Sequence, residues 1–459
     1  MLDKLFAKSV QLRLVVSFAA LIFSGSLLLS LPISQLATSQ ATYFDHLFTS
    51  VSMVCVTGLS TTAVSDTYTH FGQIICMILM QLGGLGLMSL VAFIVYNFGR
   101  RISFVDQMTL QEGLNRDDAS NFKDFLFSIF RYTFSVELIA TAIFSIRFVP
   151  LLGWKQGIFS SLFLAISAFC NAGFDNFGSS SLQNYAHDPL VVLTVAGLII
   201  LGGLGFSVWF DIRRNFQEFR KSKGTNNRRP FYKRLSYHTR VVLTTTAGIL
   251  LMGTISTLAT EFRNVGTIGN FTFMDKIMTS FFQSVTMRTA GFATIDYTKA
   301  NPISLLIYCV QMFIGGSPGG TAGGIKTTTF LIVMVFLLSV IRGHRYSNFK
   351  SRTFSLDLIR KSLVVFVLFV STFILGLAFL TITDPQVPFL HLTFESMSAL
   401  GTVGVSANLT PHLTRYGQTI LMMLMFIGRL GPLTLLIGLS RQDKKHRNLH
   451  LAEAQILVG

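Results

Sequence analysis

The chain has 459 residues, of which 51% are hydrophobic and only 13% are charged, and its net charge is +16. Soluble chains carry about 25% charged residues, so this composition excludes an ordinary soluble protein and indicates a membrane protein. The positive charge would suit a nucleic-acid-binding protein, but most of the 37 Lys and Arg lie in five segments that alternate with acidic ones across the apolar runs. This distribution follows the positive-inside rule, so it predicts both termini in the cytoplasm and no nucleic-acid partner.

The apolar runs occur in pairs along the chain, with a shorter segment between the members of each pair. The first members are long enough to cross about 30 Å of hydrocarbon, and they cover residues 14–31, 126–150, 241–258 and 363–380. The second members cover residues 71–98, 190–210, 305–341 and 416–439. The segments between them have about 12 half-apolar residues, too few to cross as a helix, so each should enter the membrane and return. The sequence therefore predicts an all-α integral membrane protein with eight transmembrane helices and four re-entrant pore loops.

Two glycine motifs recur four times in register. The first is centred on four glycines that are 115, 118 and 113 residues apart. A phenylalanine stands ten residues before each of these glycines. Its residues are Val56, Thr57, Gly58, Asn171, Ala172, Gly173, Thr289, Ala290, Gly291, Thr402, Val403 and Gly404. The second motif lies in the second apolar run of each pair, at residues 83–86, 202–205, 315–319 and 428–431. This repetition predicts four helix–pore loop–helix repeats in pseudo-fourfold symmetry, with bounds 1–99, 100–224, 225–350 and 351–459.

The first motif has the properties of an ion filter. Four glycine-centred loops around one axis would present rings of backbone carbonyl oxygens, which can replace the water shell of a cation. The preceding short helices would point their negative ends at the same place, and glycine permits close backbone approach and positive φ. The three motif residues of each loop carry no charge. We therefore expect a site for a weakly hydrated monovalent cation rather than a divalent one, which would require carboxylates.

On these motifs, and over essentially its whole length, the chain resembles the Ktr/Trk/HKT superfamily of potassium transporters, and most closely the bacterial KtrB-type membrane subunits. The resemblance implies uptake of K⁺ through a channel-like central pore, with K⁺ bound at the four glycines. It also implies that Gly58, where sodium-selective plant relatives have serine, favours potassium. A homodimer, a separate cytosolic nucleotide-binding ring of the KtrA type and location in the plasma (inner) membrane follow from the same resemblance. Sodium dependence is typical of these systems, and whether Na⁺ is coupled or only activates stays open.

The second apolar run of the third unit contains six glycines and one proline within ten residues, which a membrane helix cannot accommodate. A glycine-rich packing face is one alternative. A phosphate cradle is another, but Ile325 separates the glycines from the lysine that such a loop needs. The preferred interpretation is a movable intramembrane gate, which the resemblance also implies. The predicted gate residues are Gly315, Gly316, Ser317, Pro318, Gly319, Gly320, Thr321, Ala322, Gly323, Gly324, Lys326 and Arg429.

Arg429 replaces the second glycine of the second motif in the fourth unit. An arginine in the middle of a membrane costs about 2.5–3.5 kcal/mol on insertion scales and usually faces a partner or a cavity. We expect it to bind carbonyls of residues 315–324 or of the pore loops, to brace the closed gate and to repel cations below the filter. Snorkelling to the cytoplasm is the alternative. Lys326 is either an ordinary lysine at a helix end or a second charge of the gate.

Three further charged residues fall within or beside the apolar runs. Glu137 needs a partner from another helix, and the sequence does not say which. Arg288 is either a charge of the outer vestibule or, preferably, a member of an ion pair. Glu395 is expected to satisfy backbone donors behind the filter rather than to bind the ion.

Two rival functions are weaker. A secondary Na⁺/K⁺ transporter with alternating access would have helices broken in symmetry-related pairs, whereas the sequence predicts one broken span, at residues 305–341. A membrane-embedded enzyme would need His, Asp, Glu or Cys clustered at one depth, and no such cluster is evident. We therefore expect a potassium channel-like transporter that is not an enzyme and has no covalently bound cofactor.

Overall fold

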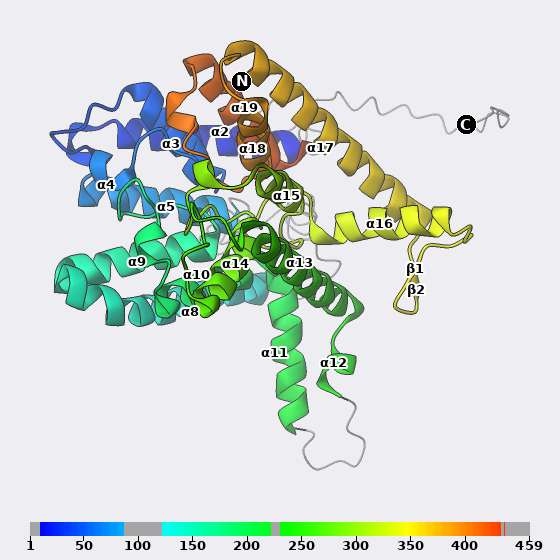
Figure 1. Ribbon diagram of the computed structural model, residues 1–459. Coiled ribbons are helices and arrows are strands. Elements are labelled where there is room, and N and C mark those ends of the chain that lie inside the picture. Colours follow the sequence, from blue (N-terminus) through cyan, green and yellow to red (C-terminus); the bar gives the residue numbers. More distant parts are fainter. Residues whose placement is uncertain (1–9, 87–121, 222–229, 433–435, 437–459) are drawn as a thin grey trace.

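The computed structural model describes residues 10–86, 122–221, 230–432 and 436, and this part of the chain is mostly helical (Figure 1). The helices are α2 (Val10–Leu29), α3 (Tyr43–Val54), α4 (Val64–Thr67), α5 (His70–Leu85), α8 (Phe122–Leu152), α9 (Trp154–Cys170), α10 (Pro189–Gly203), α11 (Phe206–Lys221), α12 (Phe231–Arg234), α13 (Tyr237–Glu261), α14 (Phe273–Thr286), α15 (Pro302–Phe313), α16 (Thr327–Ile341), α17 (Leu356–Thr383), α18 (Phe389–Leu400) and α19 (Arg415–Leu430). Short 3-10 turns lie at Pro32–Ser34, Gln183–Tyr185, Tyr297–Lys299 and Thr410–His412. Among the described residues, the only strands are β1 (Asn348–Phe349) and β2 (Arg352–Thr353), which pair antiparallel.

The helices repeat one arrangement four times. In each unit a longer helix packs against a short helix of 12 to 17 residues, and a second apolar helix follows. The units are α2–α3–α5, α8–α9–α10, α13–α14–α15 and α17–α18–α19. The second apolar helix of each unit, which follows the short helix, also packs against the short helix of the next unit. The pairs are α5 with α9, α10 with α14, α15 with α18 and α19 with α3. Because the last of these contacts joins the fourth unit to the first, the units form a closed ring.

Three of the described helices are long and apolar enough to cross a membrane: residues 127–152 of α8, α13, and α17. They coincide with three of the predicted first members of the pairs. The pair α10 and α11 would make a fourth span if counted together, but the two helices are bent by 96° at their junction. Shorter apolar helices lie at residues 14–29, 70–85, 302–313 and 327–341.

The bend between α10 and α11 corrects the expectation of one uninterrupted apolar span at residues 190–210. Gly205 has φ of +90°, and a Cβ there would lie 2.5 Å from the carbonyl oxygen of Pro318. The amide of Phe206, instead of continuing the helix, donates to the carbonyl oxygen of Gly319 at 3.1 Å. α5 and α19 likewise end directly before Gly86 and Gly431, both at positive φ. The expectation that only the third unit is interrupted was therefore wrong, while residues 87–98 of the first unit lie outside the described residues.

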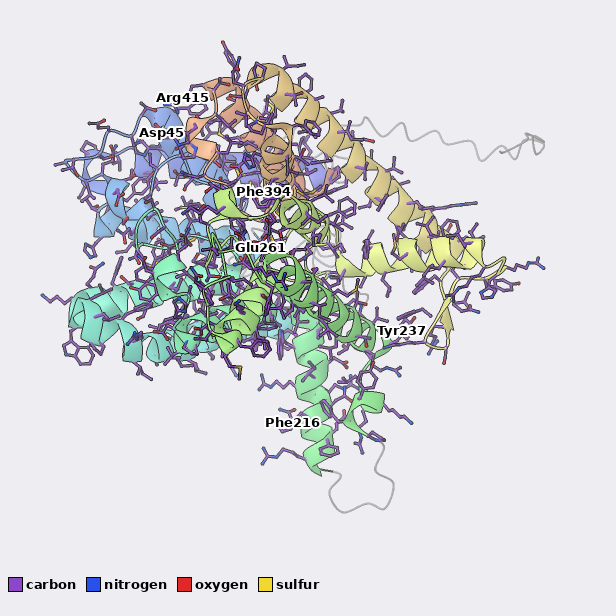
Figure 2. The ribbon with its side chains drawn as sticks, in the orientation of Figure 1. Asp45, Phe216, Tyr237, Glu261, Phe394 and Arg415 are labelled. Atoms are coloured by element: carbon purple, nitrogen blue, oxygen red, sulfur yellow. The ribbon has the colours of Figure 1, made fainter. Side chains whose placement is uncertain are left out.

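Polar side chains at the two ends of α13, labelled in Figure 2 as Tyr237 and Glu261, connect this helix to neighbouring segments. Glu261, fully buried at the end of α13, accepts the backbone amide of Asn301 at 2.9 Å, just before α15 begins. Tyr237, at the start of α13, donates to the carbonyl oxygen of Phe349 in the hairpin at 2.8 Å. α11 and α12 project away from the ring, and Phe216 on α11 is 52% exposed (Figure 2).

Candidate functional site

The four first-motif loops share an unusual backbone. In each, the residue two places before the glycine adopts the left-handed conformation, although none of the four is a glycine. These residues are Val56, Asn171, Thr289 and Thr402, with φ of 55°, 60°, 62° and 50°. Such positions cost about 1–3 kcal/mol each and gather at functional sites. The motif glycines themselves have φ from 72° to 108°.

The four glycines interlock in a cycle. Each one lies against the carbonyl oxygen of the residue that precedes the glycine in another unit. The approaches are Gly58 to Ala172, Gly173 to Ala290, Gly291 to Val403 and Gly404 to Thr57. A Cβ added to the first three glycines would lie 2.9, 2.7 and 2.9 Å from these oxygens, and one on the fourth would lie closer still. Any side chain would therefore displace the neighbouring loop, so the fourfold glycine has a direct steric cause.

Backbone amides of three of these loops donate hydrogen bonds to serine side chains of the short helices. The amides of Gly58 and Gly404 donate to Ser52 Oγ and Ser398 Oγ at 3.1 and 3.0 Å. In the second unit Ser167 Oγ, at the corresponding position, accepts from Phe174 N at 2.9 Å. The serines hold these three loops to the ends of their helices, so the three amides are directed toward the helices.

A cavity of about 480 Å³ lies on one side of the four glycines, and all four of them line it. Its walls come from the residues that follow the glycines in each unit, at 59–64, 174–183, 293–298 and 405–411. The four repeats, separated by more than a hundred residues in sequence, thus meet at the floor of one cavity.

Residues 314–326 form an irregular loop between α15 and α16, and this loop contacts the residues that precede the glycines. Thr321 Oγ1 lies 3.2 Å from the carbonyl oxygen of Phe169 and 3.4 Å from Asn171 Oδ1. A Cβ on Gly323 would collide with Thr402. The backbone amides of Ser317 and Thr321 donate to the carbonyls of the second unit's second motif at 2.9 and 3.1 Å. The loop therefore lies beneath the glycine cycle, on the side opposite to the cavity.

Arg429 holds this loop from the fourth unit. Its guanidinium donates to the carbonyl oxygens of Thr321 in the loop and of Gly83 in the first unit, and at 3.3 Å to that of Gly84. The expectation of a loop carbonyl as partner is confirmed, whereas the other two partners belong to the second motif of the first unit and not to a pore loop. The snorkelling alternative does not hold, because the guanidinium is directed into the protein.

Comparisons with known proteins agree with this arrangement. Residues 6–448 match the model of the TrkH family, described as cation transport protein. The chain is 38% identical to the Ktr system potassium uptake protein B of Bacillus subtilis (strain 168), over 97% of this chain and 96% of that protein. It is 34% identical to the potassium/sodium uptake protein NtpJ of Enterococcus hirae, over 98% and 97% of the two chains. The chain belongs to the TrkH family of cation transport proteins. It is therefore a transport protein and not an enzyme.

The fold agrees with that assignment. The crystal structure of the potassium transporter TrkH from Vibrio parahaemolyticus superposes with a TM-score of 0.71, covering 96% of this chain and 86% of that one at 18% identity. The predicted resemblance to the Ktr/Trk/HKT superfamily is thus confirmed.

The other charged residues singled out in this TrkH-family chain have the following surroundings. Lys326 both begins α16, as its N-cap residue, and turns its Nζ back to the carbonyl oxygen of Ala322 at 2.7 Å. Glu137 on α8 accepts from Gln81 Nε2 of α5 at 3.0 Å, which identifies the partner that the sequence left open. Glu395, fully buried, accepts from the hydroxyls of Ser406, at 2.9 Å, and Thr410. It also accepts from the backbone amides of Ala407 and Thr410, as the sequence predicted.

The expected ion pair of Arg288 is wrong as far as the described residues show. Its side chain is 4% exposed, and its one hydrogen bond there goes to Thr246 Oγ1 of α13 at 3.5 Å. Arg288 is also not among the residues that line the cavity, so it is not a vestibule charge. It packs instead against α13, behind the third filter loop.

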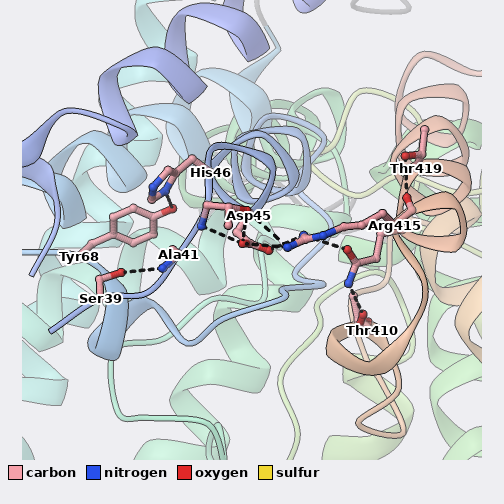
Figure 3. Close-up of polar contacts among 10 residues, drawn as sticks. Ser39, Ala41, Asp45, His46, Tyr68, Thr410, Arg415 and Thr419 are labelled. Carbon is pink, nitrogen blue, oxygen red and sulfur yellow. Dashed lines mark hydrogen bonds and ion pairs between the residues drawn. The ribbon is translucent and has the colours of Figure 1, made fainter.

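Sequence reasoning missed the contact that closes the ring between the first and fourth units (Figure 3). Arg415, at the start of α19, donates to Asp45 Oδ1 on α3 at 2.9 Å. Burial by itself would raise the pKa of the Asp45 carboxyl, but hydrogen bonds from Arg415 and Thr42 outweigh it and lower that pKa to about 2. Beside it, His46 and the buried Tyr68 hydroxyl lie 3.0 Å apart. No pattern in the sequence relates two residues this far apart along the chain.

The structure also explains the second glycine motif, whose role the sequence did not reveal. Its first glycine packs against the last turn of the short helix of its own unit in three of the four units. The contacts join Gly83 to the carbonyl oxygen of Val54, Gly202 to that of Phe169 and Gly428 to that of Leu400. A side chain at these positions would push the second helix away from the filter loop.

Proposed function

We propose that this chain is the membrane subunit of a Ktr-type potassium uptake system, and that K⁺ passes through a central pore formed by the four glycine-centred loops. The cycle of glycines and carbonyl oxygens at the floor of one cavity carries this proposal. The names of the two relatives, a potassium uptake protein and a potassium/sodium uptake protein, support potassium as the ion.

The filter we propose consists of the backbone of the first motif in each unit. Uncharged loops with their amides turned toward the helices leave carbonyl oxygens for the ion, which suits a weakly hydrated monovalent cation. The C-terminal ends of α3, α9, α14 and α18 meet at these loops, and their negative dipole ends favour a cation there. K⁺ would bind at the level of Gly58, Gly173, Gly291 and Gly404.

In the membrane, the four units would provide eight spans, and α3, α9, α14 and α18 would be the re-entrant pore helices. The repeat bounds 1–99, 100–224, 225–350 and 351–459 are those we propose from the sequence. The positive-inside pattern directs both termini and the hairpin β1–β2 to the cytoplasm of the cell, across the plasma (inner) membrane. The 480 Å³ cavity would then be the outer vestibule.

The loop at residues 314–326 would be the gate, because it crosses beneath the filter and Arg429 fixes it there. Its glycines permit the close contacts of the closed state and a second conformation as well. Opening would break the bond between Arg429 and Thr321 and move the loop out of the ion path.

Partners and coupling complete the proposal. By family resemblance, two copies of the chain would form a dimer on a cytosolic nucleotide-binding ring of the KtrA type. The name of the Enterococcus hirae relative supports a role for Na⁺, either as a coupled or as an activating ion. An alternating-access Na⁺/K⁺ symporter is the second candidate, and the helix ends at Gly86, Gly205 and Gly431 favour it, since interruptions are not confined to one unit.

The deciding experiment is rubidium-86 flux into liposomes that carry the purified protein, with K⁺, Na⁺ and Li⁺ as competitors, for the wild type and Gly58→Ser. We expect uptake that K⁺ blocks in the wild type and a loss of selectivity in the variant. No flux in either protein, with or without cytosolic extract, would refute potassium uptake. A protonophore, with equal pH on both sides, holds the membrane voltage of the liposomes near zero. Under this condition an inward Na⁺ gradient should accumulate Rb⁺ inside the liposomes only if the protein is a symporter.

A further inference from the structure

The vestibule above the glycines contains one carboxylate that has no counter-charge among the residues the structure describes. Two acidic residues, Asp175 and Asp296, line the cavity, and no Lys, Arg or His is among its described lining residues. The two acids come from different units and differ in their surroundings.

Asp296 is already neutralised. Its Oδ2 pairs with Lys299 Nζ at 3.2 Å, and its Oδ1 accepts from the amide and the hydroxyl of Thr298 at 3.0 and 2.6 Å. This carboxylate caps the turn that contains Lys299 and adds little net charge to the cavity.

Asp175 is held rigidly but stays unpaired. It is 9% exposed, its Oδ1 accepts from the amide of Phe177 at 3.1 Å, and no described basic residue forms an ion pair with it. Asn176, the next residue, donates to the buried Gln73 of the first unit at 3.1 Å and so anchors this wall to its neighbour. Burial raises the pKa of Asp175 to about 6, against the hydrogen bonds from Phe177 and Ser181 that lower it.

The carboxylate of Asp175 lies close to the four glycines. Asp175 follows Gly173 by two residues, so the carboxylate belongs to the wall directly above the filter. A buried carboxylate is stable only with a cation or hydrogen bonds to offset its desolvation, and here a single amide and one hydroxyl do so. The cavity has room for a cation with its water shell, since a liquid water occupies about 30 Å³.

We propose that Asp175 forms a capture site for a hydrated monovalent cation in the vestibule, from which the ion passes to the four glycines. This inference rests on the proposed function and adds a binding step to it. One carboxylate with neighbouring hydroxyls suits a monovalent ion, because divalent sites gather several carboxylates. Such a site does not choose between K⁺ and Na⁺, so selection remains with the filter.

Flux measurements at low ionic strength test the capture site. A charge at roughly 6 Å through wet surroundings changes a cation's local concentration about threefold. We therefore expect Asp175→Asn to raise the half-saturating external Rb⁺ concentration about threefold, with the maximal rate and the K⁺/Na⁺ preference unchanged. Asp175→Glu should restore most of the loss, and Asp296→Asn, the matched control in the same cavity, should change it less than twofold.

Screening provides a second readout that a merely structural role of Asp175 would not change. Raising the ionic strength with an impermeant salt should shrink the difference between the wild type and Asp175→Asn. External Na⁺ should compete with Rb⁺ more weakly in the variant than in the wild type, whereas Na⁺ competition equal in both would contradict a site that takes either ion. Equal half-saturation in the wild type and Asp175→Asn, or equal shifts in Asp175→Asn and Asp296→Asn, would overturn the proposal.

Calorimetric titration of RbCl into the detergent-solubilised protein separates this proposal from the proposed function. Heat of binding that persists in Gly58→Ser and is lost in Asp175→Asn would assign the site to Asp175 even if the wild type showed no flux. Gel filtration establishes that each variant is folded, and Asp175→Ser, which also removes the charge, takes the place of Asp175→Asn if the latter aggregates. Binding that is the same in all of these proteins would refute the capture site.

Discussion

Neutralising Arg429 should release the loop beneath the filter. Of its three hydrogen bonds, only the bond to Thr321 joins Arg429 to the loop, while those to Gly83 and Gly84 stay within the ring of helices. A hydrogen bond from a charged donor contributes about 1.5–3 kcal/mol. Loss of the bond to Thr321 alone therefore changes the ratio of open to closed loop by about tenfold to 150-fold, since 1.4 kcal/mol corresponds to tenfold.

The assay is rubidium-86 uptake into liposomes for the wild type, Arg429→Gln and Arg429→Lys. If closed pores limit uptake, Arg429→Gln should raise the initial rate at least tenfold without the cytosolic partner. Arg429→Lys keeps the charge but not the forked geometry, so we expect an intermediate rate. Met423→Ala, on an exposed side of the same helix, is the control and should behave as the wild type. An unchanged rate in Arg429→Gln would refute the role of this arginine in closure.

Three further predictions concern the scaffold. Gly404→Ala should abolish flux, because a Cβ there meets a carbonyl oxygen of the first unit, whereas Gly248→Ala, with open space around its Cβ position, should leave flux intact. Asp45→Asn should lower the free energy of unfolding by about 1 kcal/mol, a figure discounted because Arg415 is half exposed, and Arg415→Gln in the same background should add little more. Since the pKa of Asp45 is lowered to about 2, its contribution should persist above pH 4 and disappear as the pH falls toward 2, which thermal unfolding at several pH values would show. Gly205→Ala should weaken the docking of the loop on the second unit and raise basal uptake severalfold; uptake at the wild-type rate would contradict this.

The repeats could be predicted because the four units of the chain can be compared with one another. Four copies of each motif, in register, identify the loops around Gly58 and its counterparts before any contact is known. The helices α8, α13 and α17 could likewise be predicted from hydropathy alone, since each must bury its backbone polar groups within one apolar run.

What could not be predicted depends on contacts between units. Residues 190–210, which cover α10 and the start of α11, form one apolar run in sequence, and the bend arises because the carbonyl of Gly319, from another unit, takes the amide of Phe206. The partner of Glu137 is a neutral glutamine in the preceding unit, which no charge pattern would indicate. Arg288 is buried against a threonine, so the usual expectation of a carboxylate partner did not apply. In each case a residue of a neighbouring unit or helix determines the bend or the hydrogen-bond partner, and the local sequence does not indicate that residue.

One consequence follows from the irregular loop of residues 314–326, which the third unit supplies. A tetramer of identical subunits would have four gates, and its opening would be a concerted or stepwise event of up to fourth order. Here the proposed closure involves residues 314–326 of one unit only, so each pore has a single barrier to remove. Opening of one pore should then be a first-order event, with closed times distributed as one exponential and a response to its regulator that is not steepened by cooperation among the four units.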